Sequence, residues 1–411
     1  MSPRVRCRPA EEAELPELAE IAHGAFHQGT VEGWRTWLTE HPHRQPSDIT
    51  VARWDGRVVG LAVALRLTLA VAGKDLPMRG VAGVSVHPAY RQRGVGDALL
   101  RAVVDAMKAD GASLSMLYPF RLGFYRRYGW GLCETLELFS GAPRALPASD
   151  LRDHVEPLEP SSLPRVREVY DLARQGATGP LRRSDWWWDQ RVLSRVPKGL
   201  VYREPDHGNI DGYALYDVPE EPAYPRQRFR VRELCALTNS ARRGLLGALH
   251  GLKDQYARCE LCLPRGALRH LVQEFPAPDS GTPGAEQDLL GSLAVGAMAR
   301  VLDLGKALAA HPFHARGSVT GALGLDLQDP CLGASTWDVA FGPSDIEATP
   351  GSLARERLSL GVDVFSQVYL GGESALDALQ RGDAEGSPQA AALLDRALRG
   401  PAPFLGLQNH F

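Results

Sequence analysis

The chain has 411 residues, with 46 lysines and arginines against 49 aspartates and glutamates and a hydrophobic content of 44%. A charge balance this close to neutral gives no reason to expect binding to nucleic acid or to an acidic membrane. No apolar run approaches the length of a membrane span and the first residues carry no secretory signal, so we expect a cytoplasmic protein without membrane insertion. The six cysteines are scattered, which suits reduced thiols better than a disulfide framework. The length predicts two or three domains.

The first unit is predicted to be a mixed sheet with helices on both faces. Apolar residues at helical spacing indicate an amphipathic helix over 11–26 and a shorter helix over 30–38. Asp55-Gly56 between two β-branched runs is a hairpin signal. Strands are expected at 5–8, 49–54, 58–69, 81–86, 112–118 and 134–139, with further helices over 97–109 and 120–127.

Residues 84–100 are the stretch that points most directly to a chemistry. A β-branched strand ends at Pro88, a basic turn with Gly94 and Gly96 follows, and a helix begins at about Asp97. The first N–H groups of a helix lack intrahelical partners and carry the positive end of the helix dipole. Glycines let the backbone close around a bulky anion. The sequence therefore predicts an anion-binding cradle at this helix start.

The rest of the chain divides into two further predicted units. Residues from about 150 to 275 repeat a strand, turn and helix order, but 236–244 lack the arginine and glycine spacing of the first unit. This predicts a degenerate duplicate without a cofactor cradle. Pro276–Gly284 has the composition of a linker. Elements are expected in the second unit at 161–174, 186–188, 199–203, 212–216, 229–236, 240–252 and 258–263, and in the third at 317–327, 335–341, 363–370, 374–381 and 388–399.

A family resemblance rests on these residues. The pattern Val84-x-Val86-x-Pro88-x-x-Arg91-x-x-Gly94-x-Gly96, followed by an amphipathic helix, resembles the acetyl-CoA motif of GNAT acyltransferases. Nearly the whole chain is similar to the Eis (enhanced intracellular survival) family, with points of contact at 65–68, 123–129, 212–216 and the terminal Phe411.

The resemblance implies an α/β fold with three parts. We expect a catalytic GNAT domain over 1–147, a second, degenerate GNAT-like domain over 148–285, and a sterol-carrier-like α+β domain over 286–411 whose end reaches the active site. It also implies assembly as a homohexamer, a trimer of dimers, with acetyl-CoA as the acyl donor and no metal.

The acyl donor is expected to bind at the strand and turn of the motif. In the GNAT arrangement the strand ending at Val86 diverges from its neighbour, and its free backbone groups pair with the pantetheine arm. The N–H groups of the turn then take the pyrophosphate. The expected donor-binding residues are Val84, Ser85, Val86, Arg91, Gln92, Arg93, Gly94, Val95, Gly96 and Phe120.

Two groups are candidates for the proton chemistry of acetyl transfer. Tyr125 stands where the resembling family keeps its general-acid tyrosine, and a tyrosine hydroxyl has a pKa near that of a departing thiol. Tyr128 shares its helix face and is a competing acid. The terminal carboxylate of Phe411 is the candidate general base, because in the family the chain end returns to the first domain's site.

The acceptor is expected to be a primary amine on a small molecule or peptide. The best-known family members bind polycationic aminoglycosides with acidic residues, whereas the matching places here hold Phe26, His27, Gln28 and His410. Polycationic acceptors are therefore not favoured. Phe26, Trp34 and Trp37 are candidates either for an aromatic acceptor pocket or for the core.

Other motifs are weaker. Cys259 and Cys262 have the spacing of half a zinc site but lack a second pair, so burial is favoured. His311 and His314 suggest a metal for equally slight reasons, and the Trp186–Trp188 triplet suits core plus interface. The alternative to an acetyltransferase is a non-catalytic scaffold that binds acyl-CoA or lipid.

Overall fold

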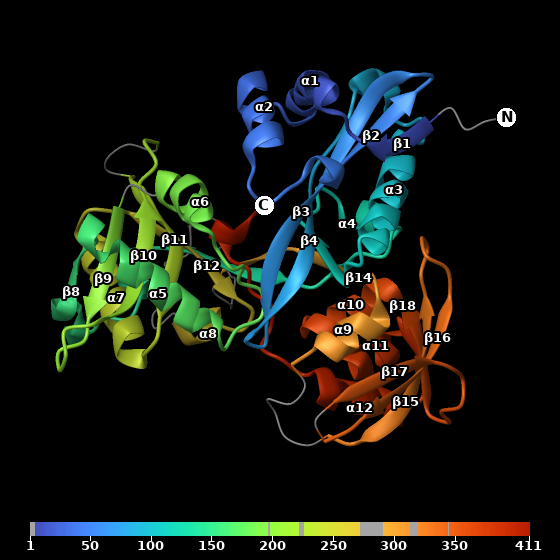
Figure 1. Ribbon diagram of the computed structural model, residues 1–411. Helices are drawn as coiled ribbons and strands as arrows, with labels where there is room; N and C mark the ends of the chain where they lie inside the picture. The colour runs from blue at the N-terminus through green and yellow to red at the C-terminus, as the bar shows by residue number, and fades with distance from the viewer. Residues whose placement is uncertain (1–4, 196–197, 222–225, 272–290, 313–318, 344) are drawn as a thin grey trace, which may run out of the picture.

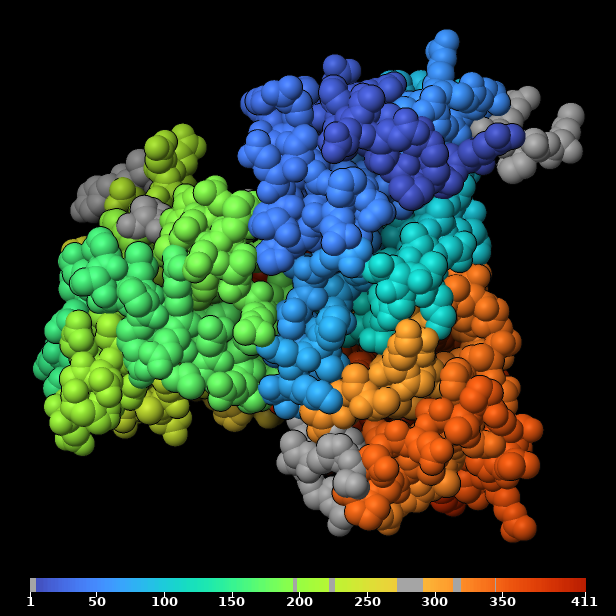
Figure 2. Space-filling model, in the orientation of Figure 1, coloured from blue at the N-terminus to red at the C-terminus, as the bar shows by residue number. Residues whose placement is uncertain are grey.

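The computed structural model describes residues 5–195, 198–221, 226–271, 291–312, 319–343 and 345–411. It consists of three sheets with their helices, each forming a separate lobe of the molecule (Figures 1 and 2). The expected α/β class with mixed sheets is confirmed. None of the described helices is long and apolar enough to cross a bilayer.

The first sheet has seven strands in the order β1-β2-β3-β4-β5-β14-β6. Its strands are β1 (Val5–Pro9), β2 (Ile49–Trp54), β3 (Arg57–Val71), β4 (Lys74–Val86), β5 (Leu114–Leu117), β14 (Met298–Val301) and β6 (Gly131–Leu132). The helices of this unit are α1 (Leu15–Phe26), α2 (Val31–Glu40), α3 (Val95–Ala109) and α4 (Leu122–Arg126).

Strand β3 shows why helices cover both faces of this sheet. Its side chains alternate between the faces, as in any strand. Leu61 and Val63 belong to the cluster that contains α1, whereas Ala62 and Ala64 belong to the cluster that contains α3. Because both faces are buried, this strand reads as a nearly continuous apolar run.

One hairpin in this sheet is longer than the sequence predicted. Strand β4 begins at Lys74 and joins β3 through Ala72-Gly73, two residues with positive φ. Pro77 stands within β4, which argues against a strand in sequence. The structure accommodates Pro77 because β4 pairs with β5 only from Arg79 onward, so the side of Pro77 away from β3 has no β5 partner.

The second sheet also has seven strands, in the order β13-β7-β12-β11-β10-β9-β8. They are β13 (Ser292–Val295), β7 (Thr135–Gly141), β12 (Arg258–Pro264), β11 (Arg228–Ala236), β10 (Ile210–Asp217), β9 (Lys198–Arg203) and β8 (Val155–Pro157). Its helices are α5 (Leu163–Arg174), α6 (Asp185–Trp187), which continues into a π-helical turn over Trp188–Val192, α7 (Asn239–His250) and α8 (Leu268–Leu271).

The third sheet has five strands in the order β17-β16-β15-β18-β19. They are β17 (Ile346–Pro350), β16 (Ser335–Phe341), β15 (Gly321–Gln328), β18 (Arg357–Gly361) and β19 (Ala384–Gly386). Its helices are α9 (Leu304–Ala310), α10 (Val362–Leu370), α11 (Ala375–Arg381) and α12 (Pro388–Leu398). After α12 the chain continues as the C-terminal tail, residues 404–411, with a short 3-10 turn at Leu407–Asn409.

The sheets share strands across the domain limits expected from the sequence. Strand β7 lies within the expected first domain but forms part of the second sheet. Strands β13 and β14 lie within the expected third domain, yet they pair in the second and first sheets respectively. The limits 1–147, 148–285 and 286–411 therefore cut through the sheets. The predicted linker Pro276–Gly284 lies outside the described residues.

Candidate active site

Strands β4 and β5 diverge at the motif that the sequence singled out. They pair in parallel only over Arg79–Val81 with Ser115–Leu117. Beyond this point β4 pairs only with β3, where the His87 N–H donates to the Val59 carbonyl. The register of β4 against β3 shifts between Leu61 and Val63, so Gly83 and Val84 form a bulge, and Val84 and Val86 line the cavity at this opening. The Val86 carbonyl accepts a 3.3 Å hydrogen bond from Arg91 Nε.

Helix α3 begins at the edge of this opening. Gly94 is its N-cap with φ of +81°, and the first intrahelical bond joins the Ala98 N–H to the Gly94 carbonyl. The N–H groups of the three preceding helical residues therefore have no partner within the helix. Nothing lies within 4 Å of a Cβ built on Gly94, so the helix start is open. A helix start of this kind suits a phosphate group.

A cavity of about 890 Å³ extends from this helix start to the end of the chain. Its lining includes most of the predicted donor residues together with Tyr125, Tyr128, Phe26, His410 and Phe411. The structure thus brings residues from α1, β4, α3, α4 and the C-terminal tail to one cavity, although they span nearly the whole sequence.

Three predicted donor residues direct their side chains elsewhere. Ser85 is buried and its hydroxyl donates to the Gly83 carbonyl at 3.1 Å. The Arg93 guanidinium lies over the rings of Trp54 and Tyr90. The Val95 side chain is buried in the core beneath α3. Phe120, in contrast, lines the cavity and is 73% exposed.

Both candidate acids line the cavity and both are buried. Burial raises the pKa of Tyr125 to about 12, so this phenol stays protonated at neutral pH. Burial and the nearby Asp97 carboxylate raise the pKa of Tyr128 to about 12 as well. The Tyr128 ring additionally contacts the guanidinium groups of Arg101 and Arg127. The structure leaves both tyrosines in place as candidates.

The chain end reaches this cavity between the first and second units (Figure 1). The His410 ring stacks on Tyr118 with centroids 3.8 Å apart, and the Phe411 ring meets Tyr118 edge-on at 5.3 Å. A Cβ on Gly80 of β4 would lie 2.8 Å from the Phe411 ring. Tyr118 and Gly80 were missed in sequence, since only the fold brings them to the chain end.

The predicted acceptor residues separate into those at the cavity and those behind it. Phe26 lines the cavity, whereas Trp34 stacks on the Phe26 ring at 5.2 Å. Trp34 Nε1 donates to the Gln28 carbonyl, and His27 forms the left-handed C-cap of α1. Neither His27, Gln28 nor Trp34 belongs to the lining. Trp37 packs against Gly83 and the core.

The charge of the lining is mostly positive. Among the described residues of the cavity wall, Asp97 in the first turn of α3 is the one acidic side chain, and the terminal carboxylate of Phe411 adds a second negative charge. Arg91, Arg121 and Arg127 also line the cavity. The end that Phe26, Gly83 and Phe411 form is apolar. This charge pattern disfavours a polycation and leaves room for an apolar amine.

The weaker motifs have structural roles. Cys259 and Cys262 lie on β12, all six cysteines are free, and the described residues contain no cluster suited to a metal ion. His311 packs on Tyr369, whereas His314 lies outside the described residues. Trp187 and Trp188 are buried, and Trp186 packs on His41 of the first unit. The triplet is therefore core plus interface, as favoured.

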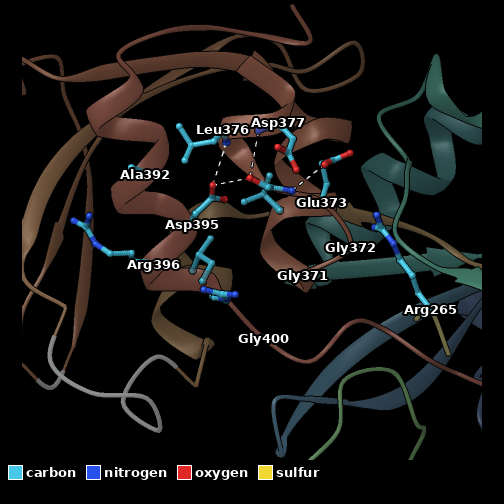
Figure 3. A pocket seen from close by; sticks show the side chains of 14 residues that line it. Arg265, Gly371, Gly372, Glu373, Leu376, Asp377, Ala392, Asp395, Arg396 and Gly400 are labelled. Atoms are coloured by element: carbon cyan, nitrogen blue, oxygen red, sulfur yellow. Dashed lines mark hydrogen bonds between the residues drawn. The ribbon is translucent and has the colours of Figure 1, made fainter. Parts of the chain in front are cut away.

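A second cavity, of about 500 Å³, is lined by residues of the third unit and by Arg265 of the second (Figure 3). The Asp395 carboxylate in this cavity points toward the start of α11. It accepts hydrogen bonds from the N–H groups of Ala375 and Leu376 and from the Ser374 hydroxyl. Glu373 pairs with Arg381. These polar groups hold helix ends, so we assign this cavity no chemistry.

Comparison with protein families accounts for most of the chain. Two family models described as acetyltransferase (GNAT) domain match residues 6–133 and 179–301. A model described as sterol carrier protein domain matches residues 304–406.

Relatives carry the same description at moderate identity. An uncharacterized N-acetyltransferase of Streptomyces griseus is 25% identical over 348 residues, 78% of this chain and 79% of its own. One from Streptomyces avermitilis is 23% identical over 414 residues, 95% of each chain. Another from that organism is 34% identical over 234 residues, 52% of this chain and 54% of its own.

Solved structures share the fold over the full length. A GCN5-related N-acetyltransferase from Anabaena variabilis superposes with a TM-score of 0.82 at 19% identity, covering 99% of this chain and 100% of its own. Eis1 from Mycobacterium abscessus superposes with a TM-score of 0.76 at 20% identity, with the same coverage. Two GNAT domains followed by a sterol-carrier-like domain form an Eis-like architecture, and the chain belongs to the GNAT family of N-acetyltransferases.

Proposed function

We propose that this protein transfers an acetyl group from acetyl-CoA directly to a primary amine, with Tyr125 as general acid and the Phe411 carboxylate as general base. The observation that carries this proposal is the single cavity that the donor motif, Tyr125 and Phe411 line together. Membership in the GNAT family implies an acyl-CoA donor. That the acyl group is acetyl and that the acceptor is a primary amine are what we propose.

The residues at the donor end fit acetyl-CoA. The opening between β4 and β5 presents backbone groups of Val84 and Val86, which suit the amides of a pantetheine arm. The open helix start at Gly94 suits the pyrophosphate, and Arg91 adds positive charge at its edge.

The proposed proton transfers balance the reaction. The amine nitrogen forms a bond to the thioester carbonyl carbon while the carbon–sulfur bond breaks. The Phe411 carboxylate accepts the proton that the amine loses, and the Tyr125 hydroxyl donates a proton to the departing thiolate. The raised pKa of Tyr125 keeps its proton available at neutral pH. The products are an acetamide and CoA with a free thiol.

The acceptor class follows from the lining of the cavity. An arylalkylamine with its amino group neutral fits the apolar end near Phe26 and Phe411, because the three lining arginines outnumber the Asp97 side chain and the terminal carboxylate and so disfavour an acceptor with several positive charges. We also infer from the Eis resemblance that the protein assembles as a homohexamer.

A thiol-release assay tests the proposal. The purified full chain is given acetyl-CoA and a panel of arylalkylamines, lysine peptides, polyamines and aminoglycosides. Arylalkylamines are expected to release CoA fastest. Tyr125→Phe and removal of Phe411 should each lower kcat by about 10²-fold, the usual contribution of a general acid or base.

Tyr128→Phe is the matched control, because Tyr128 lines the same cavity two residues beyond the end of α4. It should retain kcat within about threefold, far less than the loss of a general acid. A large loss for Tyr128→Phe with full activity of Tyr125→Phe would move the acid role to Tyr128. If no amine on the panel releases CoA, the acetyltransferase proposal fails in favour of an acyl-CoA-binding scaffold.

A further inference from the structure

The second unit repeats the strand divergence of the first. Strands β11 and β12 pair in parallel only over Arg228–Val231 with Arg258–Leu261. Their last residues, 232–236 and 262–264, lie apart, as β4 and β5 do beyond Val81. The following helix start differs, since the Thr238 hydroxyl accepts from the Ala241 N–H and caps α7 from within the chain. The Thr238 cap thus takes up one of the N–H groups that a phosphate would need, while the opening between the strands remains.

The C-terminal tail lies in this second opening. A cavity of about 330 Å³ is bounded by the diverging ends of β11 and β12 on one side and by Phe404–Leu407 and Asn409 on the other. The Phe404 N–H donates to the Thr178 carbonyl at 2.9 Å, which fixes the start of the tail to the same unit. The chain's own end therefore forms one wall of the opening between the diverging strands.

A buried polar network holds Asn409, which is 1% exposed. Its Oδ1 accepts from Arg183 Nε at 2.9 Å and from the Tyr170 hydroxyl at 3.1 Å, and its Nδ2 donates to the Leu405 carbonyl. Arg183 in turn makes two hydrogen bonds to Glu233 on β11, at 2.6 and 3.0 Å. Burial alone would lower the pKa of Arg183, but Glu233 and its neighbours hold it above its ordinary value.

Other tail residues are held at the backbone. Trp187 Nε1 donates to the Gln408 carbonyl at 2.9 Å, and the Arg191 guanidinium donates to the His410 carbonyl. The Leu405 N–H donates to Glu134, which also accepts from the Ala297 N–H. Chain ends ordinarily fray. Here the residues just before Phe411 are fixed by donors of the second unit.

We propose that the opening between β11 and β12 is the binding site for the chain's own C-terminal tail, and that Asn409 is the positioning residue which places the Phe411 carboxylate in the active-site cavity. Asn409 is the tail side chain that joins this site to the second sheet, through Arg183 and Glu233. The effect of Asn409 on turnover rests on the proposed function, in which Phe411 is the base. The binding of the tail between β11 and β12 does not depend on that function.

The test uses the full chain with Asn409→Ala and two comparison variants. Leu353→Ala shortens a 91% exposed side chain of the third unit, away from the tail and from both cavities at issue, and is the control. Tyr170→Phe removes one of the two donors to Asn409 and keeps the ring. Each variant is digested with a carboxypeptidase, and the release of Phe411 is followed by mass spectrometry. Thiol release then gives kcat and KM, and circular dichroism confirms folding.

Asn409→Ala is expected to release Phe411 about tenfold faster than the parent and to lower kcat about tenfold, since a misplaced catalytic group loses rate. The KM for acetyl-CoA should stay within about twofold, because the donor end is untouched. Tyr170→Phe should also speed the release of Phe411 and lower kcat, but each by less than Asn409→Ala does. Leu353→Ala should match the parent.

The outcomes separate the two proposals. The tail site would be overturned if folded Asn409→Ala and Tyr170→Phe both protect Phe411 from the carboxypeptidase as well as the parent does and both keep its kcat. If the parent turns over no amine, yet Asn409→Ala exposes Phe411 to the carboxypeptidase, the tail site stands and the proposed function fails. If removal of Phe411 abolishes turnover while the Asn409→Ala variant still protects Phe411 from the carboxypeptidase, the proposed function stands and the tail site fails.

Discussion

At the scale of single residues, Gly80 shows how a missing side chain shapes the site. A Cβ at this position would come 2.8 Å from two ring atoms of Phe411 and 2.7 Å from Leu67 Cδ1. Distances this short force a neighbour to move. The Phe411 ring belongs to the last residue of the chain, so it can shift more easily than a packed strand.

Gly80→Ala is therefore expected to displace Phe411 more than to unfold the protein. The expected result is a fall in kcat of about tenfold at nearly constant KM for acetyl-CoA, because a base moved by a fraction of an ångström loses rate. Gly251→Ala is a matched control, since nothing lies within 4 Å of its Cβ. Full activity of Gly80→Ala would mean that the position of the Phe411 ring does not matter to turnover.

At the scale of elements, β14 fastens the segment after α4 to the third unit. Arg300 on this strand is fully buried and donates to the Tyr128 carbonyl at 2.6 Å, directly after α4. Its other nitrogen pairs with both carboxylate oxygens of Asp329, at 2.8 and 2.9 Å. One guanidinium thus links the first sheet, the tyrosine segment and the third unit.

Asp329→Asn should destabilise the protein, because it leaves the buried Arg300 charge without a counter-charge. We expect a loss of about 3 kcal/mol in the free energy of unfolding, the usual cost of breaking a buried pair from one side. Urea unfolding followed by circular dichroism measures it. The Arg35–Glu32 pair on α2 is exposed, so Glu32→Gln should cost less than about 1 kcal/mol. Equal losses in the free energy of unfolding for Asp329→Asn and Glu32→Gln would show that the buried Arg300–Asp329 pair contributes no more to stability than an exposed pair.

At the scale of the whole molecule, aromatic residues join the first and second units beside the chain end. His41 packs on Trp186 with centroids 4.5 Å apart, and the His43 ring contacts the Ser184 hydroxyl at 3.0 Å. Burial, assisted by His43 and two arginines, lowers the pKa of His41 to about 3. The folded protein therefore holds His41 neutral, and the His43 N–H donates to its Nδ1.

The depressed pKa predicts acid sensitivity at this interface. Below about pH 6.5 the unfolded chain protonates His41 and the folded chain does not, so stability falls as the pH drops toward 3. His41→Gln removes this contribution. Between about pH 5.5 and 4 the parent should lose about 1.4 kcal/mol per pH unit more than the variant, and about half as much per unit near pH 6.5. Denaturant midpoints at a series of pH values measure the difference, and parallel curves would show that His41 is not responsible.

Much of the fold is predictable from local sequence. Periodicity located α1, α3, α7 and the three C-terminal helices, and Asp55-Gly56 located the turn between β2 and β3. The Arg91 turn and the start of α3 were also found, because a strand, glycines and a helix start are contiguous in the chain. Such features depend on residues only a few positions apart.

Tertiary structure decided what depends on distant segments. No local pattern assigns β13 and β14 to the second and first sheets, since a short apolar strand can pair with any exposed edge. Nor does one place Gly80 and Tyr118 against Phe411, or Asn409 against Arg183. By itself the sequence determined the donor-binding motif and nominated Tyr125 and Phe411. That they line one cavity follows only from packing, because the contacts that hold the C-terminal tail come from residues more than two hundred positions away.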